Sequence, residues 1–138
     1  MHTNDIHGSY KYSYNESKGT GTVGFDGLAV LYSAQSSAPD LLLDAGDTFH
    51  GQSFATMSEG KGIAELMDTF YADGYDATTP GNHDWSYGAD KLRTMTGYST
   101  TDTPFAMLCA NAGSAFWYAR LYAGKKWLEY GMRKRQSA

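Results

Sequence analysis

The sequence predicts an α/β domain with a mainly parallel sheet. Short apolar runs alternate with stretches in which apolar residues recur at helical spacing, in the order strand, helix, strand, helix, strand, helix, strand. Three of the strands lead into clusters of Asp, His, Asn and Gly. Alternating strands and helices need crossover connections, and these are right-handed and make neighbouring strands parallel.

The first half of the chain contains two of the expected strands. We expect residues 1–5 to be the last part of one strand, and residues 41–43, a Leu-Leu-Leu run, to be a strand buried on both faces. Residues 8–23 are rich in Gly, Ser, Tyr and Lys and predict a loop. Residues 25–34 predict a helix because their apolar residues fall on one helical face.

The second half repeats the alternation. Ser58 is expected to cap a helix whose core stripe is Ile63, Leu66, Met67 and Phe70, with Gly74 at its end. Residues 75–79 predict a short strand that enters a glycine turn. Residues 88–95 predict another helix, and residues 104–110 predict the last strand.

Composition and charge limit the classes of function that the chain can have. The 138 residues suit one domain with a core of its own, and no apolar run is long enough to cross a bilayer. Residues 1–113 carry five Lys or Arg against fourteen Asp or Glu, whereas residues 114–138 carry six against one. An acidic body favours metal cations and disfavours nucleic acid as a partner. The single cysteine, Cys109, excludes an intramolecular disulfide and is expected to be a buried, inert thiol.

The polar clusters follow three successive strands. Asp5 and His7 follow the first, Asp47 follows the second, and Asn82 and His83 follow the third. Ligand sites in parallel sheets lie at the carboxyl ends of the strands, so we expect these side chains to meet. Carboxylate, imidazole and amide groups together are ligands for Zn²⁺, Mn²⁺ or Fe rather than Ca²⁺.

As an ordered set, these motifs resemble the calcineurin-like metallophosphoesterases. The family's blocks are D-x-H, G-D and G-N-H-[D/E], and the chain carries them within residues 2–8, 42–48 and 81–84. Among these enzymes it is most similar to the catalytic domain of the 5′-nucleotidase family, which includes UDP-sugar hydrolases and 2′,3′-cyclic-nucleotide phosphodiesterases. The resemblance implies part of a four-layer α/β/β/α sandwich. Residues 1–113 would be the N-terminal portion of that domain, and residues 114–138 a divergent aromatic and basic tail.

The resemblance also implies roles for particular residues. Asp5 and His7 would bind the first of two divalent metal ions, Asp47 would bridge both ions, and Asn82 would bind the second. The catalytic residues would be His83 and Asp84, and His50 is a candidate for contact with the substrate. The reaction would be hydrolysis of a nucleotide or another phosphate ester by a water that the two metals activate.

The chain departs from the family pattern in places that leave its own activity open. Ser86 stands where the family carries an Asp that orients the catalytic His. The family's later His and G-H-x-H block are missing, because the four histidines of this chain are His2, His7, His50 and His83.

We therefore expect an incomplete, apparently truncated phosphoesterase. The alternative is a non-catalytic remnant that folds and binds metal weakly, and a nucleic-acid-binding module driven by the basic tail fits the acidic body poorly. We expect neither nucleic acid nor a membrane as a partner. The family is often periplasmic, secreted or at the cell surface, but no signal peptide precedes the first motif, so localisation and oligomeric state stay open.

Overall fold

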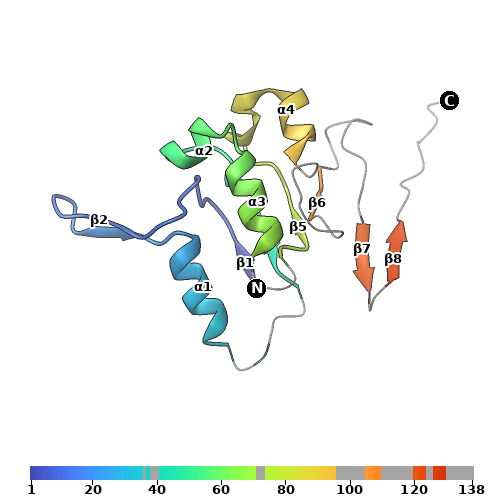
Figure 1. Ribbon diagram of the computed structural model, residues 1–138, viewed down its shortest axis with the longest axis horizontal. Helices are drawn as coiled ribbons and strands as arrows, with labels where there is room; N and C mark the ends of the chain where they lie inside the picture. The colour runs from blue at the N-terminus through green and yellow to red at the C-terminus, as the bar shows by residue number, and fades with distance from the viewer. Residues whose placement is uncertain are drawn as a thin grey trace.

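A computed structural model describes residues 1–35, 37, 41–70, 74–95, 105–109, 120–123 and 126–129. Four short strands form one sheet in the order β1, β4, β5, β6, and all three neighbouring pairs are parallel (Figure 1). The strands are β1 (His2–Thr3), β4 (Leu43–Asp44), β5 (Ala77–Thr78) and β6 (Ala106–Met107). The predicted parallel sheet and its strand order along the chain are confirmed.

Helices lie in each connection between these strands. The connection from β1 to β4 contains α1 (Phe25–Ser33), and the connection from β4 to β5 contains α2 (Ser53–Met57) and α3 (Lys61–Thr69). A 3₁₀ helix, η1 (Asp84–Tyr87), and α4 (Ala89–Arg93) follow β5. No helix of the described segments is long and apolar enough to cross a membrane.

Two predicted helix boundaries are wrong. Ser58 ends α2, a short helix the sequence analysis did not predict, and its hydroxyl accepts the Gly62 N–H at 3.1 Å near the start of α3. Helix α3 ends at Thr69 rather than at Gly74. Gly74 has a φ of +65°, and its N–H donates to the Phe70 carbonyl at 2.9 Å.

Residues 8–23 are not simply a loop. They contain an antiparallel hairpin of β2 (Ser13–Asn15) and β3 (Thr20–Thr22), and every residue of both strands is exposed. Without a buried face the hairpin needs no alternation of apolar and polar residues, so the pattern that predicts strands is missing. A second antiparallel hairpin, β7 (Arg120–Ala123) with β8 (Lys126–Glu129), lies within the predicted tail.

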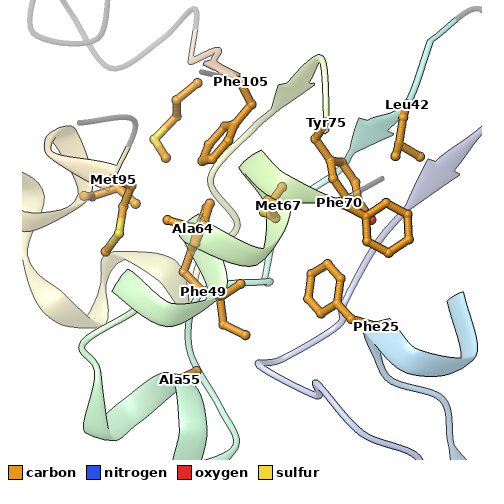
Figure 2. Packing of buried hydrophobic residues seen from close by; sticks show 13 residues of the cluster. Phe25, Leu42, Phe49, Ala55, Ala64, Met67, Phe70, Tyr75, Met95 and Phe105 are labelled. Atoms are coloured by element: carbon orange, nitrogen blue, oxygen red, sulfur yellow. The ribbon is translucent and has the colours of Figure 1, made fainter. Parts of the chain in front are cut away.

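The core gathers around α3. Ile63 and Met67 of the predicted stripe are buried, Leu66 is only partly buried, and Ala64 is buried beside them. Large apolar side chains from other segments surround this helix (Figure 2). These surrounding residues include Phe25, Phe49, Phe70, Tyr75, Leu92, Met95 and Phe105. The expectation that the strand at 41–43 is covered on both faces is wrong, since Leu42 is buried while Leu41 and Leu43 are exposed. The sheet therefore packs one face of β4 against this core.

The packing around α3 generates a stability prediction. Met67 has no exposed surface, so Met67→Ala leaves a cavity and should lower the free energy of unfolding by about 3 kcal/mol. Met57→Ala is the matched control, because that side chain is 86% exposed and its loss should cost less than about 0.5 kcal/mol. Urea unfolding followed by circular dichroism measures both. Equal losses would contradict the placement of α3 against the core.

Candidate metal centre

The chain that follows β1 runs beside the chain that follows β4. The Asp5 N–H donates to the Gly46 carbonyl at 3.0 Å, and the His7 N–H donates to the Asp47 carbonyl at 2.9 Å. These bonds continue the parallel pairing of β1 and β4 beyond the strands themselves. As a result, three of the side chains predicted to bind metal lie at the same edge of the sheet.

Asp5, His7 and Asp47 form a group that could hold a metal ion. One ligand atom from each lies within 4.8 Å of the other two, and among the described residues no other group of three His, Cys, Asp or Glu meets this condition. The His7 Nε2 is 3.4 Å from a carboxylate oxygen of Asp5, and the Asn4 side-chain amide donates to the other oxygen. Two carboxylates and an imidazole are a fitting donor set for Zn²⁺, Mn²⁺ or Fe.

Both ring nitrogens of His7 lie near oxygen atoms. Its Nδ1 lies 3.3 Å from the His50 carbonyl, and its Nε2 lies 3.4 Å from a carboxylate oxygen of Asp5. A metal bound at Nε2 would leave an Nδ1–H to donate to the His50 carbonyl. A metal-binding histidine is oriented in this way, by a hydrogen bond from its other nitrogen to a carbonyl or carboxylate.

The same three residues have unusual backbone conformations. Asp5, His7 and Asp47 have φ values of +55°, +50° and +53°, in the left-handed region that residues with a Cβ rarely occupy. Only one other non-glycine residue of the described segments, Glu59, shares this conformation. Such conformations each cost on the order of 1 kcal/mol and concentrate at functional sites. The strain is therefore independent support for a site at these residues.

The loop after β5 closes onto Asp47. The His83 N–H donates to the Asp47 Oδ1 at 2.8 Å, and Asn82 lies between His83 and Gly81. A Cβ on Gly81 would lie 2.1 Å from Asp47 Oδ1, and a Cβ on Gly46 would lie 2.5 Å from the Gly81 nitrogen. The glycines of the G-D and G-N-H motifs are therefore required for the close approach of the two loops.

Histidine rings gather at this edge. The His83 ring lies 5.2 Å from the His7 ring and 6.1 Å from the His50 ring, measured between centroids, and Tyr87 packs 5.2 Å from His50. His83 and Asn82 are exposed, while His7 and His50 are partly buried. The structure thus brings His50 to the same edge as the other predicted site residues. It places His2 in β1, with its side chain exposed.

Asp84 is buried, unlike the neighbouring His83, which is exposed. Its side chain is fully buried, and its two oxygens accept the N–H groups of Asp47, Phe49 and Gly81 at 2.8–2.9 Å. Burial raises the pKa of the Asp84 carboxyl, while the three N–H donors act to lower it. Asp84 faces the backbone of the loops rather than the exposed edge, which differs from the catalytic placement expected of it.

A second buried carboxylate, Asp44, joins three strands. It pairs in register with Thr3 of β1 and Thr78 of β5, and the hydroxyls of Thr3, Thr48 and Thr78 all donate to it at 2.7–2.9 Å. Burial raises the pKa of the Asp44 carboxyl, and the hydroxyl donors oppose that shift. The signal for this network in the sequence is the polar residues inside three short strands that end at the site.

Comparisons with known proteins point to one family. The sequence model of the family described as calcineurin-like phosphoesterase matches residues 1–136. A 5′-nucleotidase of Rattus norvegicus is 32% identical over 99 residues, which cover 67% of this chain and 17% of the relative. A 5′-nucleotidase of Bos taurus is 31% identical over the same shares, and a snake venom 5′-nucleotidase of Gloydius brevicauda is 31% identical over 64% of this chain and 16% of the relative. The chain thus spans a small part of the length of the relatives it matches.

The left-handed conformation of His7 generates a paired prediction. His7→Gly and His7→Ala remove the same imidazole, so both should lose Zn²⁺ or Mn²⁺ binding. The glycine variant should nevertheless be about 1 kcal/mol more stable than the alanine variant, because only alanine keeps a Cβ in the left-handed region. Urea unfolding of the metal-free variants measures the difference. An alanine variant as stable as the glycine variant would contradict the conformation of His7.

Proposed function

Because the chain belongs to the calcineurin-like phosphoesterase family, we propose that it is a metal-dependent phosphoesterase of the 5′-nucleotidase type. Its substrate would be a nucleotide or another phosphate ester, the class that the names of its relatives indicate. The observation that carries the proposal is the convergence of Asp5, His7 and Asp47 at the carboxyl edge of the sheet, with the His83 N–H bonded to the Asp47 carboxylate.

The donor set supports a site for two divalent cations. Asp5, His7 and Asp47 would hold the first, and Asp47 with the amide oxygen of Asn82 would hold the second. Bound there, the cations would activate a water and neutralise charge on the phosphoryl oxygens. The first position has three protein ligands and the second has two, so the first should fill at lower metal concentration. Zn²⁺, Mn²⁺ and Fe all suit mixed oxygen and nitrogen ligands.

The remaining roles fall to side chains that the substrate could touch. His83 is exposed at the edge beside His7, where its imidazole would donate a hydrogen bond to the phosphate or a proton to the leaving oxygen. His50, whose ring lies 6.1 Å from that of His83, would add a second imidazole contact. Ser86, which occupies the position of the expected orienting Asp, uses its own N–H to donate to the His83 carbonyl at 3.0 Å.

A non-catalytic metal-binding module is the second candidate. The observation that favours it is the small number of imidazole ligands, since the chain has four histidines and only His7 belongs to the group that could hold a metal ion. Such a module would bind a metal ion without hydrolysing a substrate. The division of the chain at residue 113 into a catalytic portion and a divergent tail stays a prediction under either candidate.

Hydrolysis of AMP and of p-nitrophenyl phosphate by the purified chain, with Mn²⁺ or Zn²⁺ present, tests the proposal. We expect a rate little above background, removed by chelation and reduced to background by Asp47→Asn and by His83→Ala, because each takes away a group at the reacting phosphate. His2→Ala is the matched control, since this exposed histidine in β1 should leave the rate unchanged.

The possible outcomes separate the two candidates. A metal-dependent rate that both substitutions abolish supports the phosphoesterase. Metal binding with no rate at all supports the non-catalytic module. Hydrolysis that survives both substitutions would overturn the assignment of the site.

A further inference from the structure

We propose that Asp84 is the positioning residue of the metal centre, because its buried carboxylate holds the loop of Asp47 and the loop of Asn82 in fixed relation to each other. The inference rests on the proposed function and deepens it. It assigns to Asp84 a role that acts through the backbone rather than through contact with the substrate.

The Asp84 carboxylate accepts three backbone N–H groups. Asp84 Oδ2 accepts the Asp47 N–H at 2.8 Å and the Gly81 N–H at 2.9 Å, and Oδ1 accepts the Phe49 N–H at 2.8 Å. Two of these donors lie in the loop after β4, and the third lies in the loop after β5. One side chain, with no exposed surface, therefore ties both loops together.

The loop that Asp84 holds also contacts the Asp47 carboxylate. The loop held at Gly81 also supplies the His83 N–H, which donates to Asp47 Oδ1 at 2.8 Å. Asp84 therefore fixes the main chain of Asp47 directly and the orientation of its carboxylate through His83. Because the Asp47 backbone is in the left-handed region, it needs such bonds to persist in that conformation.

Three N–H donors require a carboxylate at this position. An ionised carboxylate only accepts hydrogen bonds, and three N–H groups need three acceptor positions on its two oxygens. An asparagine would point its NH₂ group at one of these N–H groups. The position thus selects against asparagine, the replacement closest in shape.

Asp44 offers a matched control. It is also buried and also accepts several hydrogen bonds, but most of its donors are threonine hydroxyls. A hydroxyl can rotate and accept from an asparagine NH₂ group, whereas a backbone N–H cannot. Asp44→Asn should therefore disturb the strands near the site without releasing the loops of Asp47 and Gly81.

The experiment uses the whole chain with Mn²⁺ as the probe. Electron paramagnetic resonance of free Mn²⁺ gives the affinity, urea unfolding gives the stability, and proton–nitrogen spectra of the metal-free chain report the His83 amide. We expect Asp84→Asn to weaken Mn²⁺ binding at least tenfold and to move the His83 amide proton upfield as its bond to Asp47 is lost. Asp44→Asn should keep the affinity within about threefold and leave the His83 amide in place.

The outcomes distinguish this inference from the proposed function. Unchanged affinity and an unchanged His83 amide in Asp84→Asn would overturn the inference, as would losses of affinity that merely follow the losses of stability in both variants. If the wild-type chain binds no Mn²⁺, the proposed function fails, and the metal-free His83 amide still decides the role of Asp84. If Asp84→Asn does not fold, Asp84→Ser replaces it with the same expected losses, because one hydroxyl oxygen cannot accept all three N–H groups, and wild-type affinity in that variant would overturn the inference.

Discussion

The contact between the loops after β4 and β5 is the constraint on which the rest of the site depends. The Gly46–Asp47 segment must approach Gly81 so closely that neither glycine has room for a Cβ. This approach brings the His83 N–H to the Asp47 carboxylate, and the loop after β1 then adds Asp5 and His7 beside Asp47. The candidate metal ligands are therefore placed by main-chain hydrogen bonds, and their side chains extend from a backbone that is already fixed.

Two buried carboxylates stabilise the strands and loops that carry these side chains. Asp44 joins three strands through threonine hydroxyls, and Asp84 joins two loops through N–H groups. A buried carboxylate costs free energy unless hydrogen bonds replace the water it has lost, and both residues have such bonds. The bond from the Asp47 N–H to Asp84 also holds the left-handed conformation of Asp47, which the chain would otherwise avoid. The strained backbone of Asp47 and the buried Asp84 that holds it thus belong to one hydrogen-bonded network.

The sequence allowed the sheet and part of the site to be predicted because each leaves a signal in residue types. Strand and helix periodicity predicted the parallel order, and the placement of Asp5, His7 and Asp47 after successive strands predicted that they meet. The exposed hairpin of β2 and β3 left no such signal, because neither of its faces is buried. The role of Asp84 was equally hidden, since its three donors are backbone groups that every non-proline residue carries.

Diffraction from crystals soaked in Zn²⁺, recorded at the zinc absorption edge, tests the account most directly. We expect an anomalous peak bonded to carboxylate oxygens of Asp5 and Asp47 and to His7 Nε2 at about 2.0–2.2 Å. The loops should keep the positions that they have without metal. A peak bonded to His7 Nδ1, or a site formed only after the loop of Gly81 moves away from Asp47, would contradict it.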